Sequence, residues 1–342
     1  MTAYAVRPLH PVPERPRTSW TAAELLAMQF PDPVWAVPGL IAEGVNLLAG
    51  PPKVGKSWLS LGLGLAIAAG GQALGRIDVE PGPVLYLALE DTPRRLQARM
   101  RKVLAGRPAP DDLTLDVFCP PMAAGGEEYV AEWLEAHPGA RLVVIDVFAK
   151  VRGHAPAGMS AYDADYAAMG RIKRLADTFG VAVLLVHHVR KAGSEDFLAT
   201  VSGTNGIAGA ADAVLVLERG RNQGSAVLHV TGRDVEETDY PLTFDPSCGA
   251  WALADGPADE HLVGDTRAAI LRYLRAHPGS TPAQIAGGLG INRDNAKKTC
   301  ARMADDGQLN RDATGRYYAP LPGDNPDSPR TVPAVPVSPN PF

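Results

Sequence analysis

The stretch "GPPKVGKSWLSLG", residues 50–62, restricts the fold of this chain more than any other part of the sequence. Gly50, Gly55, Lys56 and Ser57 match the pattern G-x4-G-K-[ST]. The apolar run 45–50 before it predicts a buried strand, and the long apolar run 57–69 after it predicts a buried helix. A strand, a bare loop and a helix in this order place backbone N–H groups and a helix N-terminus around an anionic phosphate chain. The pattern therefore predicts an α/β fold with a nucleotide site.

The loop and the first turn of its helix supply the expected nucleotide contacts. Glycine lets the backbone turn its N–H groups inward, Lys56 can reach the β- and γ-phosphates, and the Ser57 hydroxyl can bind Mg²⁺. ATP and Mg²⁺ are therefore the expected cofactors. The predicted cofactor-binding residues are Gly50, Pro51, Pro52, Lys53, Val54, Gly55, Lys56, Ser57 and Trp58.

Strand-like and helix-like segments alternate as far as residue 219, which favours a parallel sheet covered by helices on both faces. The expected strands are 45–50, 82–91, 113–118, 141–149, 181–188 and 212–219. The expected helices are 21–30, 57–69, 92–104, 128–137 and 160–180, the last ending at Gly180. Three closely spaced segments follow, 225–233, 240–245 and 249–255, and predict antiparallel strands at the far edge of the sheet.

Acidic residues and histidines stand at the ends of the predicted strands. Because the carboxyl ends of parallel strands face the ligand crevice, Asp146 is the expected ligand of the Mg²⁺ shell. Glu90 is the expected catalytic base, while Asp91, just before Thr92-Pro93, suits a capping role. The pair His187 and His188 ends another strand, and by alternation only one of them faces the crevice. We prefer His187 as the group that contacts the γ-phosphate or the attacking water.

These segments, in this order, resemble the RecA-like ATPases, and in particular the RepA-like hexameric helicases that are grouped with the AAA-type ATPases. The resemblance covers about residues 34–246. The phosphate loop is shared by many folds, whereas the Glu-Asp pair of "GPVLYLALEDTPRRLQARM" together with "VAVLLVHHVRKAG" is much more specific. The other matching stretches are "VWAVPGLIAEGVNLLAGPPKVGKSWLSLGLGLAIAAGG", "ARLVVIDVFAKVRG", "VSGTNGIAGAADAVLVLER" and "AVLHVTGRDVEE".

The resemblance implies a RecA-like sheet, a ring of subunits with ATP at each interface, and Glu90 as the base. Many such ATPases carry two acids in the second acidic motif, but here Val147 follows Asp146, so a base elsewhere becomes necessary. A basic residue inserted from the neighbouring subunit is expected at Arg233, with Arg219 and Arg221 as alternatives. The polar loop 191–206 is expected in the central channel, with Lys191 and Thr204 as candidate DNA contacts.

Residues 265–319 predict three helices and a β-hairpin, which is the order of a winged helix-turn-helix domain. This span holds nine Lys or Arg against five Asp or Glu, so it is locally basic. Asn292, Arg293 and Asn295 begin the third helix, at the position where a recognition helix meets DNA. The predicted nucleic-acid contacts are Lys297, Lys298, Arg302, Arg293 and, on the wing beside Arg311, Arg316.

Composition and charge limit the classes of partner and the cellular location that we expect for this protein. A net charge of −5 gives no overall attraction to nucleic acid, so any basic surface must be local. The sequence contains no apolar run of about 18 residues, so we expect no membrane span. The three cysteines, Cys119, Cys248 and Cys300, form neither a disulfide nor a zinc pattern, so we expect a cytoplasmic protein with reduced thiols. The expected domains are a disordered arm 1–19, an ATPase domain 20–256, the winged helix 264–319 and a proline-rich disordered tail 320–342.

Together these features predict an ATP-hydrolysing ring, expected to be a homo-hexamer, that acts on DNA as a helicase or remodeller of a plasmid, phage or mobile element. DNA would run as a single strand through the ring channel, or bind as a duplex to the winged helix. The alternatives are an ATP-dependent DNA-bound regulator that does not unwind, and a RecA-like signalling ATPase whose tail domain binds protein.

Overall fold

The computed structural model describes residues 19–30, 32–153, 158, 160–189, 205–219, 224–256, 258 and 265–320. Most of the predicted arm and tail, the channel candidates Lys191 and Thr204, and the alternative arginine Arg221 lie outside the described residues. By contacts the chain divides into a unit of residues 1–33 and a unit of residues 34–342. Among the described residues, no helix has the length and apolar character needed to cross a membrane.

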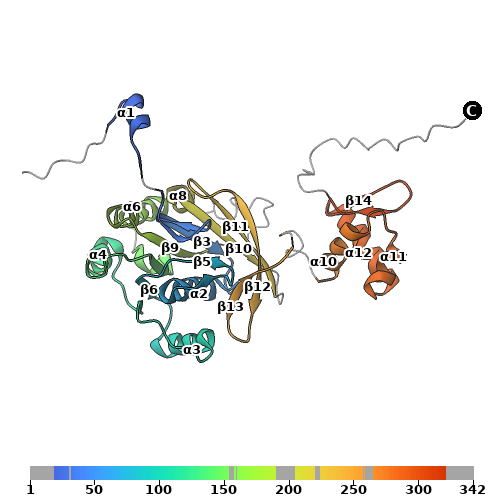
Figure 1. The fold of residues 1–342 in the computed structure, drawn as a ribbon, viewed down its shortest axis with the longest axis horizontal. Coiled ribbons are helices and arrows are strands. Elements are labelled where there is room, and N and C mark those ends of the chain that lie inside the picture. Colours follow the sequence, from blue (N-terminus) through green and yellow to red (C-terminus); the bar gives the residue numbers. More distant parts are fainter. Residues whose placement is uncertain are drawn as a thin grey trace, which may run out of the picture. The chain divides into compact units, whose positions relative to one another are not determined.

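A nine-stranded sheet forms the centre of the larger unit, in the order β13-β12-β11-β10-β3-β9-β8-β6-β7 (Figure 1). The six strands from β10 to β7 run parallel, and β11, β12 and β13 continue one edge antiparallel. The parallel strands are β3 (Gly44–Gly50), β6 (Val84–Ala88), β7 (Leu113–Asp116), β8 (Leu142–Asp146), β9 (Ala182–His188) and β10 (Ala213–Arg219). The antiparallel strands are β11 (Ser225–Gly232), β12 (Thr238–Asp245) and β13 (Ala250–Leu253). The predicted parallel sheet with an antiparallel edge is therefore confirmed.

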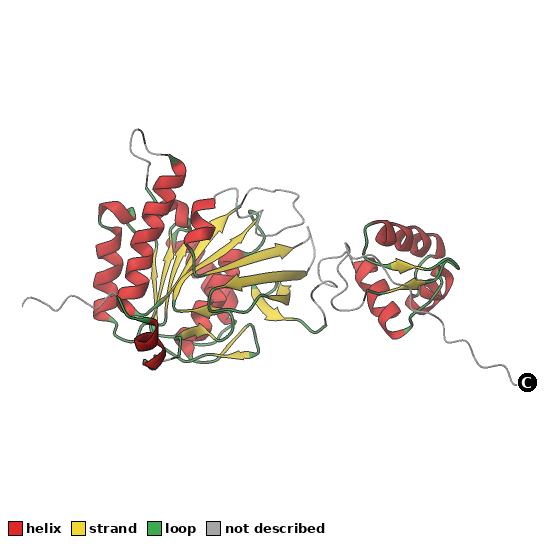
Figure 2. Cartoon of the chain, turned by 90° about the horizontal axis from the view of Figure 1, so that it is seen from above, coloured by secondary structure: helices red, strands yellow, loops and turns green. Residues whose placement is uncertain are grey.

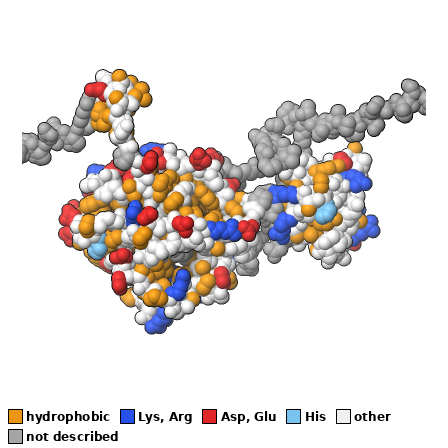
Figure 3. Space-filling view, viewed as in Figure 1, with side chains coloured by type: hydrophobic (Ala, Val, Ile, Leu, Met, Phe, Trp, Pro, Cys, Tyr) orange, Lys and Arg blue, Asp and Glu red, His pale blue; other side chains and the backbone are white. Residues whose placement is uncertain are grey.

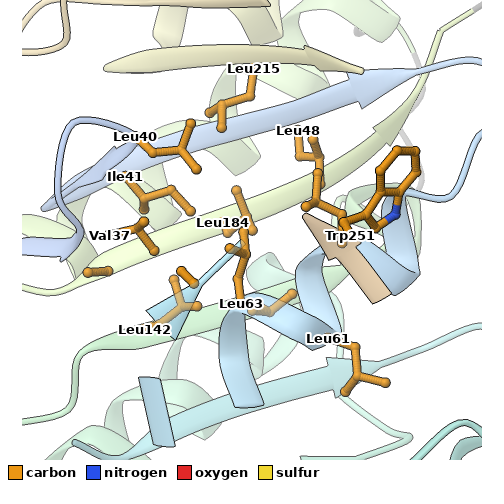
Figure 4. Packing of buried hydrophobic residues seen from close by; sticks show 14 of the residues in the cluster. Val37, Leu40, Ile41, Leu48, Leu61, Leu63, Leu142, Leu184, Leu215 and Trp251 are labelled. Carbon is orange, nitrogen blue, oxygen red and sulfur yellow. The ribbon is translucent and has the colours of Figure 1, made fainter. Parts of the chain in front are cut away.

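Helices cover both faces of this sheet, and Figure 2 shows the strands fanned between them. On one face α2 (Lys56–Ala69) and α3 (Pro93–Leu104) pack over the strands, and on the other α4 (Gly126–Ala136) and α6 (Ala161–Phe179) do so. Helix α2 is apolar on nearly all sides because β6, β8, β9 and β13 all pack against it. Leu61 and Leu63 of α2 belong to the same cluster as Leu48, Leu184 and Trp251 (Figure 4).

Two local predictions concern helix ends. Gly180 ends α6 in the left-handed conformation, with φ of 58°, as expected. The residue that caps α3 is Thr92, whose hydroxyl accepts from the Arg95 N–H, and not Asp91. Thr92 is one residue closer to Pro93, so its side chain is the one that reaches the free N–H groups of the first turn.

Several short elements were not expected from the sequence. They are β1 (Trp35–Val37), β2 (Ile41–Ala42), β4 (Gln72–Ala73), β5 (Ile77–Asp78), the 3-10 helix η1 (Met122–Ala124), α5 (Phe148–Val151) and α8 (Asn205–Ala210). All are shorter than the windows in which hydrophobic periodicity is informative.

The N-terminal unit contains α1 (Ala22–Ala27), whose first turn is fixed by a capping box between Thr21 and Glu24. No residue of α1 is buried, and Leu25, Leu26 and Phe30 are exposed.

The C-terminal part contains α10 (Asp265–Ala276), α11 (Pro282–Leu289), α12 (Arg293–Asp305) and a hairpin of β14 (Asn310–Arg311) and β15 (Tyr317–Tyr318). A separate apolar cluster holds these elements together, with Ile270, Leu274, Ile285, Cys300 and Met303 among its buried members. Thr281 and Gln284 form the expected capping box at the start of α11. The order of three helices and a hairpin matches the prediction.

Candidate functional site

The carboxyl ends of the parallel strands bring most of the predicted catalytic residues to one edge of the sheet. Strand β3 ends at Gly50, where the phosphate loop begins, β8 ends at Asp146, and β9 ends at His188. Glu90 lies two residues beyond the end of β6. This is the edge at which open α/β sheets bind ligands.

Glycine is sterically required at two points of the phosphate loop. Gly50 has φ of 153°, and a Cβ atom there would lie 2.7 Å from the Leu217 carbonyl oxygen. Gly55 has φ of 113°, and a Cβ atom there would lie 2.7 Å from the ring of Trp251. The Trp251 Nε1–H donates a hydrogen bond of 3.1 Å to the Gly55 carbonyl. The loop is thus held between β10 and β13, with little side-chain bulk.

Lys56, the first residue of α2, is buried, with only 3% of its surface exposed. Its Nζ donates to the carbonyl oxygens of Gly50 at 2.6 Å and Pro51 at 2.9 Å, and lies 3.1 Å from His188 Nδ1. Burial lowers the pKa of Lys56 to about 8, although the carboxylates of Asp146 and Glu90 act in the opposite direction. The ammonium group is therefore placed at the loop at an electrostatic cost, which an anionic phosphate would offset.

Asp146 is buried at the end of β8, and Ser57 and Tyr86 both hydrogen bond to its carboxylate. Burial raises the pKa of Asp146, while these hydrogen bonds and Arg99 limit the rise. A hydroxyl and a carboxylate side by side at a phosphate loop are hard oxygen ligands of the kind that Mg²⁺ prefers. The residues present therefore fit a magnesium–nucleotide site in which Ser57 and Asp146 hold the cation directly or through water.

A pocket of about 210 Å³ opens beside these two residues. Its lining residues are Ser57, Ala88, Glu90, Asp91, Arg95, Arg99 and Asp146. The Glu90 side chain is about half exposed, which leaves its carboxylate accessible to water.

Two arginines of α3 reach the same pocket and were not singled out from the sequence. Arg95 and Arg99 form ion pairs with the nearly buried carboxylate of Asp91, at 3.1 and 2.5 Å. Asp91 therefore belongs to the pocket wall and does not cap α3. The sequence signal was present, since Arg95 and Arg99 stand four and eight residues after Asp91, on one helix face. The basic residues of a helix more often face solvent than line a site, so the spacing alone did not predict that Arg95 and Arg99 reach the pocket.

The two histidines at the end of β9 point to opposite faces of the sheet. His188 lies on the α2 face, where it contacts Lys56 and where its Nε2 is 3.8 Å from Glu90 Oε2. His187 lies on the other face, with its ring against Phe148, and burial lowers its pKa. The preference for His187 therefore differs from the structure, which places His188 beside the lysine. The alternation argument was sound, but the face that α2 covers was not known from the sequence.

Arg233 follows the end of β11, which runs antiparallel to the six parallel strands. It therefore lies at the edge of the sheet opposite the phosphate loop, where its Nη1 is 3.4 Å from Asp212 Oδ1. Arg219 ends β10 on the same edge as the loop, and its guanidinium lies over the rings of Phe244 and Trp251.

The basic residues predicted to contact DNA lie in the C-terminal part. Arg293, Lys297, Lys298 and Arg302 are all exposed on α12, and Figure 3 shows blue basic side chains on the visible face of this part. Asn292 is used locally, because its side-chain oxygen accepts from the N–H groups of Asp294 and Asn295 and so caps α12. Arg316 donates to the Gly279 carbonyl at 2.7 Å, so it braces the hairpin.

Comparison with solved structures identifies the fold. The chain is similar to a structure described as an ATPase domain, with a TM-score of 0.52 and 14% identity over 62% of this chain and 85% of the other. It is also similar to a DnaB-like replicative helicase solved with its interactions with primase, with a TM-score of 0.52 and 14% identity over 63% of this chain and 58% of the other. These matches support a RecA-like ATPase fold for the large sheet and its helices.

A family model described as an AAA domain matches residues 10–194. The match covers more than half of the chain and includes the phosphate loop, the Glu90 turn, Asp146 and both histidines. This chain therefore belongs to the AAA domain family of ATPases.

Proposed function

We propose that this protein hydrolyses ATP with Mg²⁺ in a ring of identical subunits and acts on DNA as a RepA-like helicase or remodeller. The observation that carries the proposal is that Ser57, Asp146 and Glu90 line one small pocket at the carboxyl edge of the sheet, and that the buried Lys56 of the phosphate loop is close enough for Asp146 and Glu90 to act on its charge. A phosphate chain in the loop provides an anionic partner for the buried Lys56 ammonium. Bound Mg²⁺ supplies electrostatic stabilisation of the charge that develops on the phosphoryl oxygens.

Each residue then has a separate task. Lys56 moves from the Gly50 and Pro51 carbonyls to the β- and γ-phosphates, while Ser57 and Asp146 orient the cation. Glu90 accepts a proton from the attacking water, because its carboxylate lines the pocket and remains open to solvent. His188, between Lys56 and Glu90, takes the γ-phosphate contact that the sequence suggested for its neighbour His187.

Arg95 and Arg99 give the pocket a positive wall. In the described structure both guanidinium groups pair with the one carboxylate of Asp91, which offsets only one of their two positive charges. Arg99 also lies over the Trp58 ring, with 5.5 Å from its guanidinium carbon to the ring centroid. An incoming γ-phosphate competes with Asp91 for these guanidinium groups, so that the α3 contacts differ between the triphosphate and diphosphate states.

Assembly into a ring, expected to be a hexamer, is supported by the fold and by the apolar side chains that α1 leaves exposed. The arginine contributed by a neighbouring subunit remains a choice among Arg233, Arg219 and Arg221. Arg233 is held by Asp212 at the opposite edge of its own sheet, so it meets a nucleotide only if it belongs to another subunit. Mixing Arg233→Ala with Lys56→Ala subunits restores part of the activity if Arg233 acts across an interface. The same mixing experiment with Arg219→Ala tests the alternative.

DNA contact is proposed through the exposed basic face of α12 and through the loop that contains Lys191 and Thr204. The C-terminal part has the element order of a winged helix, and Lys297, Lys298 and Arg302 are exposed where they can meet phosphates. Lys297→Glu is expected to weaken binding of duplex DNA, whereas Arg107→Glu, a matching charge reversal at an exposed position just after α3, is not.

The deciding experiment measures ATP turnover with and without single-stranded DNA, alongside the mass of the assembly. Wild type is expected to hydrolyse ATP faster with DNA and to separate strands, and Lys56→Ala is expected to lose turnover while Arg107→Ala retains it. Site-specific duplex binding that responds to ATP, without strand separation, would instead favour the DNA-bound regulator. An ATP turnover rate that is the same with and without DNA would favour the signalling ATPase. Absence of nucleotide binding would refute the proposal.

A further inference from the structure

A buried tyrosine lies directly behind the carboxylate that is expected to serve the metal. Tyr86, in the middle of β6, has only 1% of its surface exposed. Its hydroxyl donates a hydrogen bond of 2.9 Å to Asp146 Oδ2 on the neighbouring strand β8. The side chain therefore contacts the proposed metal ligand from the protein interior and not from the pocket.

A fully buried serine completes this arrangement. Ser60 Oγ lies 2.9 Å from the Tyr86 oxygen, on α2, three residues after Ser57. A phenol carries one proton and a carboxylate only accepts, so when the Tyr86 proton is donated to Asp146 the Ser60 hydroxyl must donate to Tyr86. The hydrogen bonds therefore run in one direction, from Ser60 on α2 through Tyr86 on β6 to Asp146 on β8.

The hydroxyl of Tyr86 is not needed to fill the core. Phenylalanine would occupy nearly the same volume, and burying a hydroxyl is unfavourable unless it is hydrogen bonded. Among the described residues, the Tyr86 hydroxyl contacts the Asp146 carboxylate and the Ser60 hydroxyl, with the Ser57 carbonyl at 3.4 Å. All three partners belong to or adjoin the proposed cation site.

We propose that Tyr86 is a positioning residue that orients the Asp146 carboxylate toward the divalent cation that accompanies the bound nucleotide. This inference rests on the proposed function. Hydrogen bonds to ligands of a metal fix the ligand orientation, and their loss commonly weakens metal binding by about 10- to 100-fold. Tyr86 acts through Asp146 and contacts neither the nucleotide nor the cation.

The test measures Mn²⁺ binding directly, by the electron paramagnetic resonance signal of free Mn²⁺, in the full-length chain saturated with ADP. Tyr86→Phe is expected to weaken Mn²⁺ binding by about tenfold or more. ADP binding in EDTA is expected to be unchanged in this variant. A general loss of structure would weaken ADP binding as well. Tyr129→Phe is the matched control, because Tyr129 also donates its hydroxyl to a carboxylate, that of Asp116, away from the site.

Ser60→Ala provides a second route to the same answer if Tyr86→Phe does not fold. It is expected to weaken Mn²⁺ binding by about threefold, and the double variant should bind no more weakly than Tyr86→Phe alone, because both changes act on one network. Wild-type Mn²⁺ affinity in Tyr86→Phe, or in Ser60→Ala when only that variant folds, would overturn the inference while leaving the proposed function standing. Wild-type protein that binds neither ADP nor Mn²⁺ would overturn both.

Discussion

His229 gives a prediction whose sign and size follow from the structure. It lies on β11 with 9% of its side chain exposed, between two carboxylates on the neighbouring strands. Its Nδ1 is 2.7 Å from Asp239 Oδ1 and its Nε2 is 3.5 Å from Glu218 Oε2. Burial acts to lower the pKa of His229, but Asp239 and Glu218 outweigh it and raise the pKa from 6.5 to about 9.

This pKa difference stabilises the fold when the imidazole is charged. Because the folded pKa lies above the unfolded one, the contribution is fully present below pH 6.5 and is lost as the pH rises through about 9. At about 1.4 kcal/mol per pKa unit, the upper limit is about 3 kcal/mol. Both carboxylates are more than half exposed, so solvent screening reduces the expected contribution to about 1–2 kcal/mol.

The assay is urea unfolding of wild type and His229→Gln, followed by tryptophan fluorescence at pH 6, 7.5 and 10. All five tryptophans precede residue 252, so the signal does not report on the C-terminal helices. Wild type should exceed His229→Gln in free energy of unfolding at pH 6, and this advantage should shrink by about 1–2 kcal/mol by pH 10. Asp239→Asn should remove most of the same pH dependence. A wild-type advantage that is constant from pH 6 to pH 10 would refute the reasoning.

Three further predictions concern the phosphate loop and its surroundings. Nucleotide affinity should be constant below pH 7.5 and fall above the Lys56 pKa of about 8, by up to about tenfold per pH unit, since a neutral amine must regain its proton to bind phosphate; a fluorescent-nucleotide titration that is flat to pH 9.5 would contradict this. Glu90→Gln should bind ATP as wild type does and lose hydrolysis, and normal turnover in that variant would reject Glu90 as the base. Gly249→Ala should lower the free energy of unfolding by roughly 1–3 kcal/mol more than Gly106→Ala, because both glycines have positive φ but only at Gly249 would the new methyl lie 2.4 Å from the Trp58 ring; equal losses in urea unfolding would show that backbone strain alone is responsible.

Much of the fold was predictable because apolar runs of the parallel strands are long and end in polar residues. Asp146 and Glu90 were placed correctly at the carboxyl edge on this basis, since parallel strands bring their ends together whatever their order in the sheet. The order of helices and the hairpin in the C-terminal part followed from capping residues such as Thr281 and Gln284.

The remaining site features depend on which face or direction an element presents, and these are tertiary properties. His188 replaces His187 beside Lys56 because α2 covers the face on which even-numbered residues of β9 lie. Arg233 follows β11, a strand that was predicted to be antiparallel, and the end of this strand lies far from the loop of its own subunit, so a role for Arg233 at a nucleotide depends on how the subunits assemble. Tyr86 stands in an apolar run and is indistinguishable by pattern from a packing residue until its hydroxyl is seen to contact Asp146.

The hydrogen bond between the Trp251 indole and the Gly55 carbonyl links the phosphate loop to a fluorescent side chain. If the loop changes shape when phosphate enters or leaves, either this hydrogen bond breaks or β13, at the outer border of the sheet, shifts with the loop. In both cases the surroundings of one indole change, so the protein carries its own optical label for the filled and empty states. A stopped-flow trace of its native emission would time the arrival of nucleotide without any attached dye.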